Sequence, residues 1–207
     1  MAAGMNFYRV YSFKYGYDSF NPGVGNTRFA PFADSAGVVV PTMYGGVDPT
    51  VVLLESVFHE IGARGDRVIY ERSLRERGLA YATSDRSLQL VDLRDSELDR
   101  LGLGRHQLVA ADSAHYACTR EWAQWLHRLS IGGKSSDGLI WHSRSAELVT
   151  SSQQREVFVL FGDRAPSAPG SYPLVGPGVR NLFEGEGRAR VDELAEELDA
   201  RVELLDP

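Results

Sequence analysis

The pattern of apolar and polar positions divides the chain into short strands and helices. Alternation in NFYRVYSF, residues 6–13, predicts a first strand, and the apolar run at 37–46 predicts a second strand that ends in two glycines. Helical spacing begins after Asp48, which is a suitable N-cap followed by Pro49 at the first helical position. We expect this helix to end at Gly62, because glycine readily adopts the backbone that closes a helix.

The middle of the chain continues this mixed pattern. Residues 66–78 are charged and fit a strand followed by a turn. Further strands are expected at 79–84, 88–93, 138–143 and 155–162, and helices at 95–103 and 111–129. The second of these helices is amphipathic, with one face formed by Tyr116, Thr119, Trp122, Ala123 and Leu126. The order of elements predicts an α+β fold, with a mixed, largely antiparallel sheet core and flanking helices.

Two segments depart from regular structure. Residues 16–35 are rich in Gly, Pro, Asn and Asp and predict a long loop, and a loop of that length in a compact domain is usually functional or disordered. We expect a domain over residues 1–163, and a Pro- and Gly-rich linker with an acidic amphipathic helix over 164–207. The apolar stripe of that helix comprises Val191, Leu194, Ala195, Leu198, Val202 and Leu205. The helix either packs on its own domain or contacts another chain, in a homodimer or with a partner protein.

Composition and charge narrow the class of protein. Hydrophobic residues make up 43% and charged residues 24%, as in ordinary globular domains. The net charge of −6 argues against direct nucleic-acid binding, and residues 184–207 alone hold nine acids against three arginines. A single cysteine, Cys118, excludes an internal disulfide framework and a cysteine-rich metal site. With neither a signal peptide nor a membrane-spanning run in view, we expect a cytoplasmic protein.

Familiar catalytic motifs are incomplete in this chain. GVGNTR, from Gly23, lacks the third glycine of the dinucleotide fingerprint and does not follow a strand. GGKSS, from Gly132, follows a helix where a phosphate loop would follow a strand, and HEIGA, from His59, lacks the second histidine of a zinc motif. We therefore expect neither a Rossmann-type cofactor nor a metal.

Glu55 stands out because it interrupts the apolar run VVLLESVF. A carboxylate at the border of a buried face must be paired, protonated or used in function, and a structural ion pair with a core arginine is the alternative to a functional role. Other polar or aromatic residues in notable positions are Arg9 in FYRVY, Arg28 beside Phe29, Tyr44 before two glycines, and Ser143 at the end of GLIWHS. Each of these has an ordinary structural alternative when considered alone.

Taken in order, these residues resemble the RES-domain family, which is named for an arginine, a glutamate and a serine. The matching segments are FYRVY, NPGVGNTRF, PTMYGG, VVLLESVFHE, LQLVDL, YACTREWAQWL, DGLIWHSR and VFVLFG, spread over residues 7–162. The resemblance implies an ADP-ribosyltransferase-like fold and an NAD+-consuming toxin whose partner is an Xre-type antitoxin. Two features depart from the family pattern: Phe29 stands where many relatives have tryptophan, and the tail after residue 164 has no counterpart.

The resemblance also implies roles for five residues: Arg9, Arg28, Tyr44, Glu55 and Ser143. The arginines, Arg28 first, would bind the pyrophosphate, and Tyr44 would stack on the nicotinamide. Glu55 would hold a ribose hydroxyl and oppose the positive charge that develops on the sugar, while Ser143 would orient substrate or Glu55 without acting as a nucleophile. The expected reaction is cleavage of the nicotinamide–ribose bond by hydrolysis or phosphorolysis. The alternatives are ADP-ribosyl transfer to a protein and a catalytically silent NAD-binding module.

Overall fold

The protein is built on a six-stranded sheet in the strand order β4-β1-β2-β9-β8-β5. The computed structural model describes residues 1–59, 61, 67–150, 155–178 and 181–203. The strands of this sheet are β1 (Asn6–Ser12), β2 (Thr42–Gly46), β4 (Arg77–Thr83), β5 (Leu90–Asp92), β8 (Gly138–His142) and β9 (Glu156–Phe161). Adjacent strands of the sheet run antiparallel, except that β5 and β8 run parallel to each other. The predicted α+β fold with a mixed, largely antiparallel sheet is confirmed.

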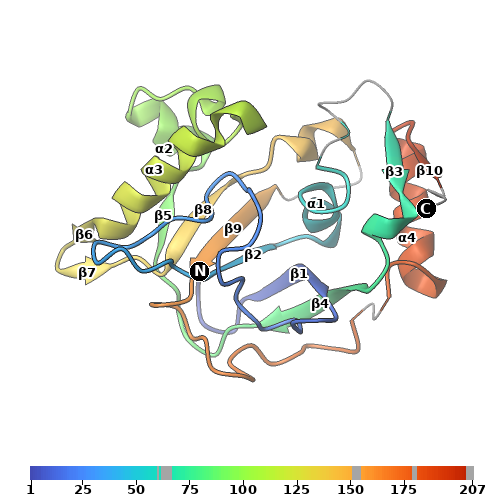
Figure 1. Ribbon diagram of the computed structural model, residues 1–207, viewed down its shortest axis with the longest axis horizontal. Coiled ribbons are helices and arrows are strands. Elements are labelled where there is room, and N and C mark those ends of the chain that lie inside the picture. The colour runs from blue at the N-terminus through green and yellow to red at the C-terminus, as the bar shows by residue number, and fades with distance from the viewer. Residues whose placement is uncertain (60, 62–66, 151–154, 179–180, 204–207) are drawn as a thin grey trace.

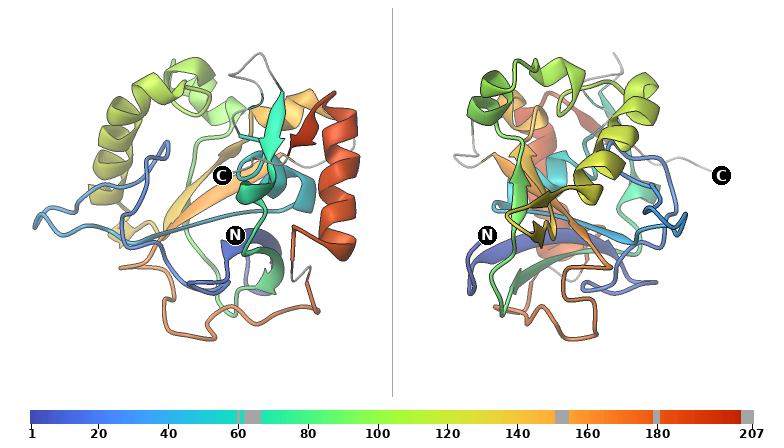
Figure 2. Two further views of the ribbon diagram at one scale, coloured as in Figure 1. Left: turned by 45° about the vertical axis from the view of Figure 1, so that its right-hand side comes forward. Right: turned by 90° about the vertical axis from the view of Figure 1, so that its left-hand side faces the viewer.

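Helices surround this sheet on several sides (Figures 1 and 2). They are α1 (Pro49–Leu54), α2 (Asp95–Arg100), α3 (Tyr116–Arg128) and α4 (Gly185–Glu197), with short 3-10 turns at Glu71–Ser73, Arg105–Gln107, Ser113–His115 and Ser145–Leu148. In Figure 1, α2 and α3 lie at one end of the molecule and α4 at the other, with α1 between them. Smaller pairs are formed by β3 (Val68–Tyr70) with β10 (Arg201–Glu203), and by β6 (Ser130–Ile131) with β7 (Lys134–Ser135).

The two faces of the sheet have separate apolar cores. On β1, Tyr8 and Val10 pack against the core that includes α1, whereas Phe7 belongs to a second cluster that includes Tyr172. This division follows from the alternation of side chains along a strand. The side chain of Arg9, the residue before Val10, therefore projects from the face of the sheet opposite α1.

The first helix is shorter than its sequence pattern predicts. Asp48 caps α1 as expected, its side chain accepting hydrogen bonds from the backbone N–H groups of Thr50 and Val51. The helix ends at Leu54, however, and Glu55 is its C-cap. The next residue, Ser56, donates its hydroxyl to the carbonyl of Val52 at 2.5 Å, which competes with a continuing backbone ladder. Glu55 thus lies at the end of a helix rather than within one, and Gly62 lies outside the described residues.

The predicted strand at 37–46 is also shorter, because the described strand starts at Thr42. Val38 and Val39 are exposed, and this stretch makes only an isolated bridge between Ala33 and Val39 before the sheet begins. Pro41, which cannot donate a backbone hydrogen bond, immediately precedes the strand.

The C-terminal segment packs on the same domain. Helix α4 buries Val191 and Leu194 in the core on the α1 side. The expected helical stripe does not continue to the end, because Asp199 takes a positive φ of 51° and the chain returns as β10 along β3. Val202 is therefore a strand residue, and Leu205 lies outside the described residues. The Pro- and Gly-rich stretch before α4 passes along the outer edge of β4, where Ala82 bridges Leu174.

Candidate active site

The centre of the candidate site is a hydrogen bond between two residues that lie far apart in the sequence. Ser143, directly after β8, is fully buried and donates its hydroxyl to Glu55 Oε1 at 2.5 Å. The same hydroxyl accepts the backbone N–H of Ala146 at 3.2 Å, and Ser143 donates its own N–H to the carbonyl of Arg155 at 2.8 Å. Ser143 is thus fixed from three sides, and it fixes one oxygen of the carboxylate.

Arg28 lies on the other side of the carboxylate. Its Nη1 is 3.8 Å from Glu55 Oε2, and the two side chains are 11% and 23% exposed. Nη2 donates to the carbonyl of Ala111 at 3.4 Å, and the guanidinium lies over the ring of Tyr116, 5.6 Å from its centroid. The backbone carbonyl of Arg28 accepts the hydroxyl of Thr119. Helix α3 and the segment before it therefore hold Arg28 against Glu55.

Tyr44, on β2, anchors the loop that carries Arg28. Its hydroxyl pairs with that of Thr27 at 2.8 Å and accepts the backbone N–H of Phe29 at 3.1 Å. Its ring meets Trp141 edge-on, with centroids 6.2 Å apart. Burial raises the pKa of Tyr44 to about 12, so the phenol stays protonated at neutral pH. In this structure Tyr44 fastens the residues on either side of Arg28.

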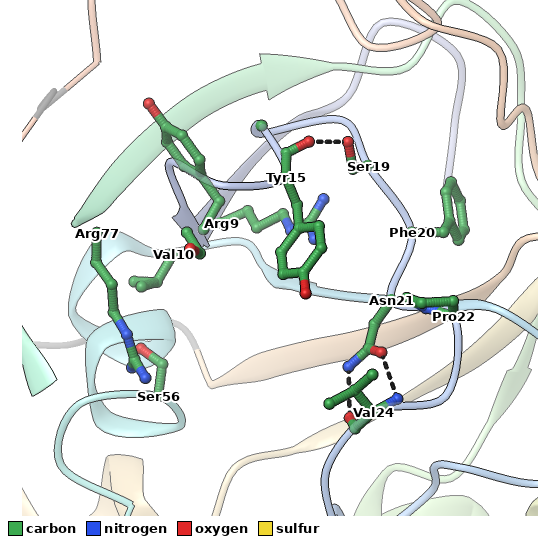
Figure 3. Close-up of a pocket in the computed structure, with 13 residues that line it drawn as sticks. Arg9, Val10, Tyr15, Ser19, Phe20, Asn21, Pro22, Val24, Ser56 and Arg77 are labelled. Carbon is green, nitrogen blue, oxygen red and sulfur yellow. Dashed lines mark hydrogen bonds between the residues drawn. The ribbon is translucent and has the colours of Figure 1, made fainter.

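Arg9 is separate from these four residues. It points from β1 to the face opposite α1, and its Nη1 donates to the carbonyl of Tyr17 at 2.6 Å. Burial lowers the pKa of Arg9 to about 10, and the nearby charge of Asp18 opposes this shift only in part. Arg9 lines a cavity of about 270 Å³, shown in Figure 3. Ser56, the residue after Glu55, lines the same cavity, so the two regions adjoin through the end of α1.

The sequence reasoning missed the residues that hold the Arg28 loop. Thr119 was assigned only to the apolar face of its helix, and Tyr116 likewise. Arg120, on the same helix, donates to the side chain of Asn26 within the loop. The sequence offered no signal for these contacts, because Thr119 and Arg120 are 91 and 94 positions away from their partners Arg28 and Asn26.

The assembled site offers a carboxylate with one oxygen held by Ser143 and the other facing Arg28. Such a carboxylate can accept a hydrogen bond from a ligand hydroxyl and can stabilise a positive charge that develops close to it. Among the residues that the structure describes, no group of three or more His, Cys, Asp or Glu side chains is arranged to hold a metal ion. None of the described helices has the length and hydropathy of a membrane span.

Comparison with known proteins identifies relatives of this architecture. The family model of the RES domain matches residues 6–178. A chain of the M. tuberculosis MbcT–MbcA toxin–antitoxin complex, known from a crystal structure, superposes with a TM-score of 0.59 over 95% of this chain and 91% of that chain, at 15% sequence identity. The curated proteins contain no match. The structural likeness shows that this chain shares the fold of that crystal structure.

Proposed function

Because the chain belongs to the RES-domain family, we propose that it is an enzyme that cleaves the nicotinamide–ribose bond of NAD+, acting as the toxin of a toxin–antitoxin pair. The observation that carries this proposal is the Ser143–Glu55–Arg28 arrangement, with its 2.5 Å hydrogen bond to one carboxylate oxygen. The M. tuberculosis neighbour, which is part of a toxin–antitoxin complex, supports the second half of the proposal.

In the proposed reaction the bond between the ribose anomeric carbon and the nicotinamide nitrogen breaks, and its electron pair leaves with the neutral base. Positive charge then develops on the ribose. Glu55 is 23% exposed and can accept a hydrogen bond from a ribose hydroxyl while its charge stabilises that cation. Water or phosphate adds an oxygen to the anomeric carbon and releases a proton. We assign Ser143 to positioning, since its hydroxyl is already committed to Glu55 and Ala146.

Arg28 has a narrower role than its sequence context suggests. Its guanidinium is engaged by Glu55, by the carbonyl of Ala111 and by the ring of Tyr116. We propose that Arg28 orients the carboxylate and lines the ribose subsite. A phosphate placed directly on Arg28 would also lie close to Glu55, and the like charges would repel.

The test of this proposal is NAD+ turnover by purified protein, with nicotinamide release followed by chromatography. Glu55→Gln keeps the size of the side chain and removes its charge, and we expect a rate loss of about 10²-fold or more. Glu193→Gln, an exposed glutamate on α4, is the matched control and should retain full rate. Full activity in Glu55→Gln would refute the assignment of Glu55.

The same reactions, run with labelled NAD+, identify the acceptor. Free ADP-ribose indicates hydrolysis, its 1-phosphate indicates phosphorolysis, and label on protein indicates ADP-ribosyl transfer. Binding of NAD+ without any of these products would make the chain a silent NAD-binding module.

The proposed partner is an Xre-type antitoxin protein. Induced expression of the wild-type chain should arrest growth of a bacterial host and lower its NAD+ content, whereas Glu55→Gln should do neither. Co-expression of the product of an adjacent gene should relieve the arrest and co-purify with the chain. Growth arrest without a fall in NAD+ would show that the toxicity has another cause.

A further inference from the structure

His127, near the end of α3, is a buried histidine with both ring nitrogens engaged. Its side chain is 4% exposed, and the rings of Phe32 and Phe161 meet the imidazole edge-on, with centroids 5.3 and 5.1 Å away. Nε2 lies 3.0 Å from Asp163 Oδ2, and Nδ1 lies 3.3 Å from Arg164 Nη2. Because an arginine can only donate, Nδ1 accepts from Arg164 and Nε2–H donates to Asp163. These contacts specify one neutral tautomer of the ring.

Arg164 is held in place independently of His127. Its Nη1 donates to the carbonyl of Ser136 at 3.3 Å, and its own carbonyl accepts a hydrogen bond from Arg86 Nη2 at 2.7 Å. Its Nε lies 3.7 Å from Asp163 Oδ2. A proton added to Nδ1 of His127 would turn an accepting nitrogen into a donor and set two cations against each other. Charging His127 therefore breaks its contact with Arg164.

The charged groups that act on His127 come from two elements packed against it. Asp163 and Arg164 follow β9, and Asp34 belongs to the loop between β1 and β2. On α3 itself, the adjacent Arg128 is exposed to solvent. Burial lowers the pKa of His127 below its ordinary value, Asp163 opposes this shift, and Arg164 adds to it. The ring is thus neutral at pH 7 and gains a proton only in acid.

His127 is the last of a row of α3 side chains that hold the loop carrying Arg28. In the rest of the row, a side chain of the helix donates to the loop. These contacts run from Thr119 to the carbonyl of Arg28, from Arg120 to the side chain of Asn26, and from Gln124 to the carbonyl of Ala33 at 2.7 Å. His127 adds Phe32 to this row. A displacement of His127 and Phe32 therefore acts on the same tethered segment that places Arg28 against Glu55.

We propose that His127 is a proton-sensitive latch. When the ring gains a proton in acidic solution, it separates from Arg164, releases Phe32 and its loop from α3, and so withdraws Arg28 from Glu55. The proton comes from solvent by way of Asp163, whose side chain is 37% exposed. The charged ring keeps Asp163 as its partner, so the change is local and reversible. Only the consequence for catalysis rests on the proposed function, since release of the loop needs no substrate.

The test is an NMR titration of the wild-type protein between about pH 4 and 8, a range that spans the titration of histidines in proteins. The imidazole of His127 reports the proton, and the backbone amide of Phe29 reports the loop. Arg164→Gln should raise the midpoint of both signals and Asp163→Asn should lower it. Each change should be about one pH unit or more, because each variant removes a charge that touches the ring. A role in packing alone would not move the midpoint in opposite directions.

A further substitution removes the proton-binding group itself. His127→Gln keeps one donor and one acceptor but does not gain a charge in this range, so the transition of the Phe29 amide should be lost. The matched control is His106→Gln, an exposed histidine on the 3-10 turn at Arg105–Gln107, which should keep the wild-type transition. The substitutions are independent of one another, so a variant that fails to fold leaves the test to the others.

The outcomes separate the latch from the reaction. A Phe29 amide that follows His127, and moves oppositely in Arg164→Gln and Asp163→Asn, supports the latch even if NAD+ is never cleaved. A Phe29 amide that titrates unchanged in His127→Gln, or stays constant while His127 gains its proton, overturns it. Where NAD+ is cleaved, the wild-type rate should fall in acid with the midpoint of His127, and His127→Gln should lack that fall. Cleavage that depends on Glu55 but shows no such midpoint overturns the coupling to Arg28 and leaves the proposed function standing.

Discussion

Removing the hydroxyl of Ser143 tests whether the candidate site depends on the bond that joins its two halves. Ser143→Ala deletes a fully buried group that donates to Glu55 at 2.5 Å and accepts from the backbone N–H of Ala146 at 3.2 Å. A hydrogen bond to a charged group contributes about 1.5–3 kcal/mol, and the N–H of Ala146, a residue 1% exposed, would lose its partner. We therefore expect a loss of about 1.5–3 kcal/mol in the free energy of unfolding.

For a domain of this size, each kcal/mol lowers Tm by about 2–4 °C, so the expected fall is roughly 3–12 °C by calorimetry. Turnover should fall by about tenfold or more with little change in KM, because the freed carboxylate samples orientations that do not face the ribose. The control is Ser135→Ala, an exposed serine on the β6–β7 hairpin, which should change neither quantity. Wild-type Tm and kcat in Ser143→Ala would refute the reasoning, and complete loss of activity with an unchanged Tm would instead favour a direct chemical role for Ser143.

Three further perturbations address the loop, the cavity and the C-terminal helix. Tyr44→Phe removes the hydroxyl that holds Thr27 and Phe29, and should lower the free energy of unfolding by about 1–3 kcal/mol and speed proteolysis within the loop. An unchanged cleavage pattern would contradict the anchoring role. Because burial lowers the pKa of Arg9 to about 10, affinity for ADP should fall as pH rises through that value, while affinity for adenosine stays level. A flat profile would contradict the binding of pyrophosphate by Arg9 that the family resemblance implies. Leu194→Ala on α4 should lower the free energy of unfolding by about 2–5 kcal/mol, as measured in a denaturant titration. If its effect were no larger than that of an exposed substitution on α4, the helix would not be part of the hydrophobic core.

The local elements were predictable because they depend on residues close in sequence. Asp48 and Pro49 placed the start of α1 correctly, and alternation placed β1. The end of α1 was missed because the decisive contact is a side-chain hydrogen bond from Ser56 to Val52, which apolar periodicity does not register. Helical spacing also continued through Val202, although the positive φ at Asp199 turns the chain there into a strand.

The site was predictable in part, for a different reason. Glu55 drew attention because a carboxylate in an apolar run requires a partner, but its partners are 27 and 88 positions away, as Arg28 and Ser143. Only the folded sheet and the loop bring them together. The structure agrees with both interpretations of Glu55, as a structural ion pair and as a functional group. Its carboxylate lies within ion-pair distance of Arg28, and it remains partly exposed, as a functional group requires.

The loop between β1 and β2 gives a physical reason for these residues to act together. It leaves β1 just beyond Arg9, forms one wall of the cavity beside β1 with Tyr15 and Val24, and ends by placing Arg28 against Glu55. Tyr44 fastens its far end, through Thr27 and Phe29. A ligand that orders this loop at the cavity would therefore also steady Arg28 at the carboxylate, since both belong to one tethered segment. It follows that binding at the cavity and bond cleavage should be coupled, so substitutions that loosen the loop should raise the KM for NAD+ and lower kcat together.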